Sequence, residues 1–219
     1  MRPLAWQAAE VLVPASSDPP RSALKLEARR LVAGEANAIA VVAPPHPLYG
    51  GTLHNPVVVG IAEGLQRAGV PSLAFNWRGI DGSEGARTDS LEAAVADYLA
   101  AIETVADGKP LYAAGYSFGA AVALLAACED KRIQGVIMLA PPAGMLRAED
   151  LATVTSPVSV MVGDDDEFAP LSELEKKING RSGASLQVIP GADHFFHYGG
   201  LSEIPELVHS LAQRWSGGS

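Results

Sequence analysis

A serine flanked by two glycines, at the junction of an apolar strand and an apolar helix, most constrains this chain. The pentapeptide Gly115–Gly119 (GYSFG) follows a short apolar run, Leu111–Ala114, and precedes the alanine-rich segment Ala120–Ala127. Glycines two residues before and after the serine let a strand and a helix approach closely, because a Cβ atom there would clash. The free amides of the helix N-terminus then favour negative charge at Ser117. The pattern predicts a strand–turn–helix of the nucleophile-elbow type.

Short apolar runs alternate with helical patterns along most of the chain. We expect buried strands over Ile39–Ala43, Val70–Phe75, Leu111–Ala114, Ile133–Ala140, Val158–Val162 and Ser185–Ile189. We expect helices over Asn55–Ala68, from a cap at Asp89 or Ser90 to Val105, and over Ala120–Ala127, Leu171–Ile178 and Ile204–Trp215. Continuous apolar runs are typical of strands covered on both faces, and their alternation with helices predicts a parallel, doubly wound sheet.

The N-terminal part of the chain has a different pattern. Trp6–Val13 and Ala23–Leu31 predict two strands, joined by a turn over Ser16–Pro20, as an antiparallel hairpin at a sheet edge. Only about fifteen residues connect the strand ending at Ala140 to the one starting near Pro157, which predicts a loop and no cap domain. We expect one α/β domain over residues 1–215 and a disordered tail over residues 216–219.

The composition limits which kinds of partner the protein can bind and in which cellular compartment we expect it. The net charge of −9 argues against nucleic acid or an anionic membrane as a partner, because both require basic patches. The single cysteine, Cys128, cannot form a disulfide within the chain, and its apolar surroundings predict a small buried side chain. The N-terminus predicts no signal peptide, and no run is long enough to span a membrane. We therefore expect a cytoplasmic protein, a monomer or homodimer, that acts on a small molecule.

Reactive side chains follow three of the predicted strands. Ser117 follows one, the aspartates at 164, 165 and 166 follow another, and His194 follows the last. In open α/β sheets, ligands bind outside the carboxyl ends of the strands. The order Ser, Asp, His is that of α/β-hydrolases and differs from the orders in chymotrypsin and subtilisin. We expect His194 to take the serine proton and one aspartate to orient its imidazole.

Six stretches together resemble the small, lidless α/β-hydrolases close to the dienelactone-hydrolase-like and prolyl-oligopeptidase-like enzymes. They are PHPLYGGTLHNPVV (45–58), FNWRGIDGSEG (75–85), GYSFGA (115–120), APPAG (140–144), VGDDDEFAP (162–170) and GADHFF (191–196). The resemblance covers nearly all of the chain from Ala38 on and implies a mostly parallel sheet flanked by helices, without a cap domain. Dienelactone hydrolases proper carry a cysteine nucleophile, whereas this chain has Ser117, so the resemblance does not imply that activity.

The resemblance also implies roles for single residues. Asp166 stands three residues after the strand-ending glycine, where the family usually has its triad acid, and Asp164 is the alternative, expected to bond the turn. Leu48 takes the last place of the family's His-Gly-x motif, so its amide is implied as the second oxyanion donor beside that of Phe118. Tyr49 is the alternative second donor.

Other residues near the predicted site leave alternatives. His197 competes with His194 for the base role, and the position of His194 directly after the last strand's loop favours it. We expect Arg78 to hold its loop by pairing with an acid. Large apolar residues there predict either an apolar substrate pocket or simple core packing. The candidates for such a pocket are Tyr49, Met145, Phe168, Phe195, Phe196 and Tyr198.

The predicted function is that of a serine hydrolase. Its expected reaction is the cleavage of a small carboxylic ester through an acyl-enzyme intermediate at Ser117. No spacing of histidines and acids predicts zinc, and neither a metal nor an organic cofactor is expected. A thioesterase, a lactonase, a peptidase and a catalytically silent binding protein are the alternatives on the same fold.

Overall fold

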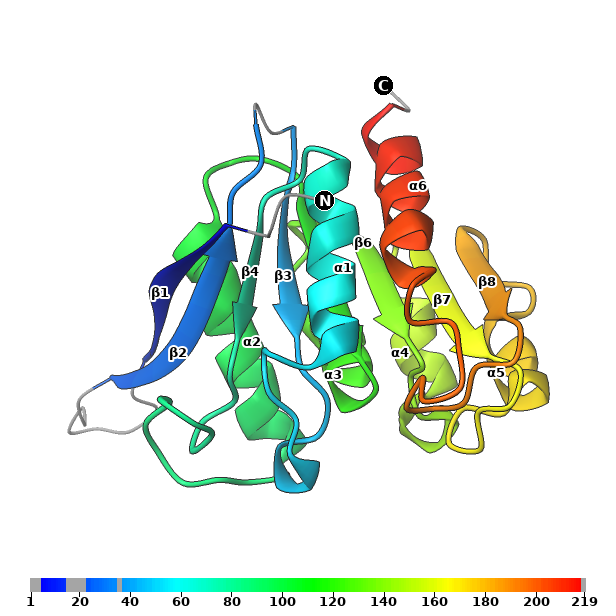
Figure 1. Cartoon of the computed structure of the whole chain (residues 1–219), viewed down its shortest axis with the longest axis horizontal. Coiled ribbons are helices and arrows are strands. Elements are labelled where there is room, and N and C mark those ends of the chain that lie inside the picture. Colours follow the sequence, from blue (N-terminus) through cyan, green and yellow to red (C-terminus); the bar gives the residue numbers. More distant parts are fainter. Residues whose placement is uncertain (1–4, 15–22, 35–36, 218–219) are drawn as a thin grey trace.

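The computed structural model describes residues 5–14, 23–34 and 37–217. In this part of the chain, eight strands form one sheet in the order β1-β2-β4-β3-β5-β6-β7-β8, with helices on both faces (Figure 1). The strands are β1 Trp6–Val13, β2 Leu24–Leu31, β3 Ile39–Ala43, β4 Ser72–Phe75, β5 Leu111–Tyr116, β6 Ile133–Leu139, β7 Val158–Gly163 and β8 Ala184–Ile189. The helices are α1 Pro56–Arg67, α2 Leu91–Val105, α3 Phe118–Glu129, α4 Ala148–Thr153, α5 Leu171–Ile178 and α6 Ile204–Ser216, with 3₁₀ turns η1 Pro47–Tyr49 and η2 Ala143–Met145.

Strand directions divide the sheet into an antiparallel edge and a parallel main part. β1 pairs antiparallel with β2, which places Val11 opposite Leu26, and β2 pairs antiparallel with β4, which places Ala28 opposite Phe75. Strands β4, β3, β5, β6, β7 and β8 run parallel to one another. The predicted parallel sheet and edge hairpin are confirmed, while the predicted turn over Ser16–Pro20 lies outside the described residues.

Two hydrophobic layers cover the sheet, one on each face. Helices α1 and α6 pack together over one face, and α2 and α3, with α4 and α5, cover the other (Figure 1). Successive side chains of a strand point to opposite faces, so β5 contributes side chains to both layers. Ala113 joins the layer of α2 and α3, whereas Tyr112 and Ala114 join that of α1 and α6. The continuous apolar runs in the sequence reflect this double coverage.

Helix starts follow the expected capping residues. The side chain of Asn55 accepts a hydrogen bond from the Val57 amide at 2.9 Å, ahead of a proline in the first turn of α1. Ser90, rather than Asp89, caps α2, because its hydroxyl accepts from the amide of Ala93 at 3.2 Å. These caps fix where the loops after β3 and β4 end.

The connection between β6 and β7 is more ordered than the predicted loop. It contains η2 and the six-residue helix α4, which the sequence did not reveal. Arg147 stabilises the start of α4 by two hydrogen bonds to Asp150, at 2.8 and 2.7 Å, and Leu151 anchors the helix in the core. A helix this short shows no hydrophobic period, so the pattern could not predict it. Residues 140–157 are all described and form no cap domain.

The C-terminal helix extends slightly beyond its predicted end. α6 ends at Ser216 rather than at Trp215, so Ser216 is helical and not part of the predicted disordered tail. Residues 218–219 of that predicted tail lie outside the described residues. None of the helices in the described ranges is both long and apolar enough to cross a membrane.

Candidate active site

Ser117 lies between β5 and α3 in a strained backbone conformation, with φ of 53° and ψ of −118°. A positive φ is uncommon for a residue with a side chain and persists only where the surroundings hold it. Gly115 and Gly119 allow this turn. A Cβ on Gly115 would overlap the backbone of Gly119, and one on Gly119 would overlap the carbonyl oxygens of Ala43 and Pro44. The predicted strand–turn–helix is therefore present, and it is packed directly against the end of β3.

The hydroxyl of Ser117 lies within hydrogen-bond distance of a histidine from the far end of the chain. Ser117 Oγ is 2.9 Å from Nε2 of His194, which follows β8. Both residues are nearly buried, with exposed fractions of 9% and 6%. The carboxyl ends of the parallel strands, at the lower edge of the view in Figure 1, bring these two loops together.

Asp166 contacts the other nitrogen of the same imidazole. Nδ1 of His194 is 2.9 and 2.8 Å from the two carboxylate oxygens of Asp166, which is 4% exposed. One of these oxygens also accepts hydrogen bonds from the amides of Phe168 and Ala169, at 2.9 and 2.8 Å. With a proton on Nδ1 directed at Asp166, Nε2 is free to accept the proton of Ser117.

Asp164 has a different partner. Its carboxylate accepts a hydrogen bond from the amide of Gly191 at 2.6 Å. The amide of Asp165 donates to the carbonyl of Ala192 at 3.2 Å, and a Cβ on Gly163 would overlap that same carbonyl. The loops after β7 and β8 are therefore in close contact. Asp164 bonds the turn, as predicted for it.

His197 lies outside the arrangement around the serine. Its ring is exposed and pairs with Asp193, with Nδ1 at 3.2 Å from a carboxylate oxygen. His194 is thus the histidine that the structure brings to Ser117. Within residues 5–14, 23–34 and 37–217, no three side chains of His, Cys, Asp or Glu gather closely enough to hold a metal ion.

The two expected oxyanion donors differ in their present hydrogen bonds. The amide of Phe118, at the start of α3, has no partner within the described part of the chain. The amide of Leu48 donates to Nδ1 of His46 at 3.2 Å, and that of Tyr49 donates to the carbonyl of His46 at 3.1 Å. Burial lowers the pKa of His46, and the charge of Asp89 opposes this effect. A lowered pKa favours the neutral imidazole, which has one ring nitrogen that can accept the hydrogen bond from the Leu48 amide.

The loop after β3 lies beside the start of α3. The ring centroid of His46 is 4.8 Å from that of Phe118, and the indole of Trp77 donates to the carbonyl of Pro45 at 3.0 Å. The loop after β4 is held in turn, because the guanidinium of Arg78 donates to the carboxylate of Asp97 at 2.6 Å. The predicted structural pairing of Arg78 is confirmed.

A hollow of about 390 Å³ opens beside His194. It is lined by Asp165, Glu167, Phe168, Gly191, Asp193, His194, Phe195 and Tyr198. The ring centroids of Phe168 and Phe195 are 4.7 and 5.3 Å from that of His194, and each phenylalanine is 54% exposed. Phe168, Phe195 and Tyr198, which were candidates for a pocket or for core packing, therefore border this hollow beside His194.

Three further pocket candidates, Tyr49, Met145 and Phe196, lie elsewhere. Tyr49 is exposed beside the ring of His46, at a centroid distance of 4.7 Å, and does not line the hollow at His194. Met145 lines a separate hollow between α2 and α3, with Leu125 and Cys128. The structure does not bring Met145 to Ser117, because η2 directs the chain toward α3. Phe196, the remaining buried aromatic, packs in the core layer of α1 and α6.

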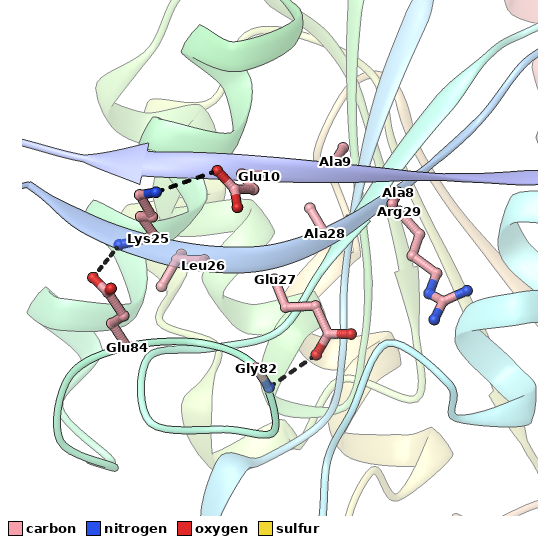
Figure 2. A pocket seen from close by; sticks show the side chains of 10 residues that line it. All are labelled: Ala8, Ala9, Glu10, Lys25, Leu26, Glu27, Ala28, Arg29, Gly82 and Glu84. Carbon is pink, nitrogen blue, oxygen red and sulfur yellow. Dashed lines mark hydrogen bonds and ion pairs between the residues drawn. The ribbon is translucent and has the colours of Figure 1, made fainter.

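A further hollow, of about 500 Å³, lies along the edge hairpin and apart from these residues (Figure 2). Its carboxylates are engaged in structural contacts. Glu27 accepts from the amide of Gly82 at 3.0 Å and from the side chain of Asn76 at 2.9 Å. Asn76 is fully buried and accepts from the amide of Leu53 at 2.7 Å. The hairpin thus holds the loop after β4 and, through Asn76, the loop after β3.

A mostly parallel sheet without a cap, with Ser117, His194 and Asp166 in hydrogen-bond contact at its carboxyl end, defines the class of fold as that of α/β-hydrolases. Residues 49–210 match the family model of the alpha/beta hydrolase domain. The chain therefore belongs to the α/β-hydrolase family, as its resemblance to small lidless members predicted. A protein of Rickettsia prowazekii (strain Madrid E), itself uncharacterized, is 31% identical over 188 residues, which are 80% of this chain and 79% of that protein.

Solved structures confirm the fold. An alpha-beta serine hydrolase homologue from Coxiella burnetii is 30% identical, with a TM-score of 0.78 over 93% of this chain and 96% of its own. A serine hydrolase without a lid from Xanthomonas campestris is 26% identical, with a TM-score of 0.79 over 95% of each chain. The predicted parallel sheet, the edge hairpin and the absence of a cap agree with this family.

Proposed function

We propose that this hydrolase uses Ser117 as its nucleophile and cleaves a small carboxylic ester through an acyl-enzyme intermediate. The observation that carries the proposal is the continuous hydrogen-bonded series from Ser117 Oγ through the imidazole of His194 to Asp166. A serine hydroxyl is a weak nucleophile and requires an adjacent base, which is what His194 provides. The similarity to the serine hydrolase homologue from Coxiella burnetii and to the lidless serine hydrolase from Xanthomonas campestris supports the same assignment.

The first half of the reaction forms the acyl-enzyme. Ser117 Oγ attacks the ester carbonyl carbon while its proton passes to Nε2 of His194. Asp166 stabilises the resulting imidazolium through Nδ1–H without taking the proton itself. The tetrahedral intermediate then collapses, the bond to the alcohol oxygen breaks, and His194 gives its proton to the departing alcohol.

The second half regenerates the serine. A water molecule attacks the acyl carbon as His194 takes one of its protons. The bond between the acyl carbon and Ser117 Oγ then breaks, and the serine oxygen recovers a proton from His194. The products are a carboxylic acid and an alcohol.

Two backbone amides stabilise the negative oxygen in this proposal. The amide of Phe118 is available, and the N-terminus of α3 adds a favourable field. The amide of Leu48 is the second donor, because its present partner is the side chain of His46, which can rotate away. The amide of Tyr49 is bonded instead to a backbone carbonyl within η1, so releasing it would require the turn to open.

The substrate group beside the imidazole is proposed to be small and apolar. Phe168 and Phe195 present half-exposed rings to the hollow, and apolar surface that ligands cover is typical of binding sites. With no cap over the described residues, the site is open to the surface. The pocket assignment of Phe168 and Phe195 is therefore retained in the proposal, and that of Met145 is not.

A substrate panel tests the proposal. Short p-nitrophenyl esters are compared with acyl thioesters, lactones and aminoacyl peptides, using the wild type and Ser117→Ala. Ester turnover that is lost in Ser117→Ala supports the proposal. Turnover confined to thioesters, lactones or peptides, and lost in Ser117→Ala, would support Ser117 as the nucleophile but contradict an ester as the substrate. Ester turnover that is unchanged in Ser117→Ala would contradict the assignment of Ser117 as the nucleophile and the acyl-enzyme mechanism with it.

A further inference from the structure

We propose that Tyr116 is a positioning residue that holds His194 in reach of Ser117. Its hydroxyl donates a hydrogen bond to the backbone carbonyl of His194 at 2.7 Å. Tyr116 is the last residue of β5 and directly precedes Ser117 in the chain. The inference rests on the proposed function, because it assigns a role in bringing the base to the nucleophile.

The sheet alone does not hold these two residues together. Ser117 follows β5 and His194 follows β8, and β6 and β7 lie between these strands. β8 is the last strand of the sheet and pairs only with β7 among the described strands. The position of the loop after β8 relative to β5 therefore depends on contacts that cross the width of two strands. The hydroxyl of Tyr116 makes such a contact, and its acceptor is the backbone of His194 itself.

The other contacts of His194 and its loop restrict the orientation of the ring or the position of the loop relative to β7. Asp166 fixes the orientation of the imidazole through Nδ1. The hydrogen bond that the Gly191 amide donates to Asp164 joins the loop to the end of β7, not to β5. Tyr116 alone among these residues belongs to β5, the strand that Ser117 directly follows. Its bond therefore bears directly on the distance between Ser117 Oγ and Nε2.

The surroundings of Tyr116 keep its hydroxyl in place and protonated, so that it can donate its hydrogen bond. The residue is buried, and its ring centroid is 5.9 Å from that of His194 and 6.1 Å from that of Phe196. Burial, with smaller effects of Asp166 and Asp193, raises the pKa of the Tyr116 hydroxyl. It therefore stays protonated throughout the pH range in which a histidine acts as a base.

Tyr112 provides a matched control on the same strand. It is also buried and lies on the same face of β5, four residues before Tyr116. Its ring packs on Trp215 at a centroid distance of 5.2 Å. Its hydroxyl has no hydrogen-bond partner in the described ranges. Tyr112→Phe thus removes a tyrosine oxygen from β5 without touching the loop of His194.

The experiment compares Tyr116→Phe with Tyr112→Phe and the wild type, well below the melting temperature of each. We measure kcat and KM on a p-nitrophenyl ester and the second-order rate of Ser117 labelling by a fluorophosphonate. Tyr116→Phe keeps the ring, so its packing is preserved. Its kcat and labelling rate are expected to fall about tenfold, because small misplacements of reacting groups are costly, while KM changes less than about twofold. Tyr112→Phe is expected to match the wild type.

A spectroscopic measurement separates positioning from stability. The proton on Nδ1 of His194, bonded to Asp166, is followed as a downfield NMR line, which is expected to broaden or shift in Tyr116→Phe only. A lowered melting temperature with kcat, labelling rate and NMR line unchanged would show a merely structural bond and overturn the proposal. Absence of Ser117 labelling in the wild type would overturn the proposed function, and the positioning role with it.

Discussion

Both carboxylate oxygens of Asp166 lie within 2.9 Å of Nδ1 of His194, while the carboxylate of Asp164, two residues earlier, accepts from the amide of Gly191. Two neighbouring aspartates after one strand thus have separate tasks. Asp166 is turned inward, where two backbone amides and the imidazole surround it. Asp164 remains exposed and joins the loops after β7 and β8.

The pair of substitutions Asp166→Asn and Asp164→Asn tests this division. In Asp166→Asn the amide cannot hold the productive tautomer of His194, so we expect kcat on a p-nitrophenyl ester to fall about 10³–10⁴-fold. Asp164→Asn loses at most one exposed hydrogen bond, and its kcat is expected to stay within about threefold of the wild type. A profile in which only the Asp164 change abolishes turnover would show that the acid is misassigned.

The glycine after the serine is expected to be essential for packing. A Cβ at Gly119 would overlap the backbone oxygens of Ala43 and Pro44, which cannot move as a flexible side chain can. Gly119→Ala should therefore lower the free energy of unfolding in urea by about 2–3 kcal/mol. Gly144→Ala is the control, because nothing lies within 4 Å of its added Cβ. Equal stability of the two variants would contradict the close contact between β3 and α3.

Cys128 is expected to react slowly in the folded protein. Its thiol is half-buried rather than fully buried, and lies 3.4 Å from the carbonyl of Asp150. Burial first, and the charge of Asp150 next, raise the pKa of the thiol. A raised pKa lowers the thiolate fraction at a given pH, so modification by a disulfide reagent should require a higher pH than for the unfolded chain. The rate is followed from pH 7 to 10, with and without urea, and equal rates at pH 7 would contradict the prediction.

Features repeated along the chain or tied to strand ends could be predicted from the sequence. The buried runs of β3 and β5 predicted a parallel sheet, and its topology then placed Ser117, the three aspartates after β7 and His194 at one edge. A cap of α2 at Asp89 or Ser90 and the pairing of Arg78 with an acid follow equally local rules. These predictions succeed because position along the chain determines position in such a sheet.

Features that depend on the conformation of single loops could not be predicted. The contact of Tyr116 with His194 joins residues 78 positions apart, and its existence depends on how the loop after β8 turns. The engagement of the Leu48 amide by His46 depends on one side-chain rotamer. Met145 was a candidate for the pocket, but it lines a separate hollow between α2 and α3. Each of these depends on backbone angles or on a side-chain rotamer that residue types do not specify.

Labelling of the intact protein by a fluorophosphonate tests the central proposal most directly. The mass of the wild type is expected to increase by one phosphonyl group, and peptide mapping should place this group on Ser117. His194→Ala should slow the labelling by at least about 10³-fold, since the base is lost, and Ser117→Ala should abolish it. A wild type that gains no mass, or one labelled equally in the presence and absence of Ser117, would contradict the account.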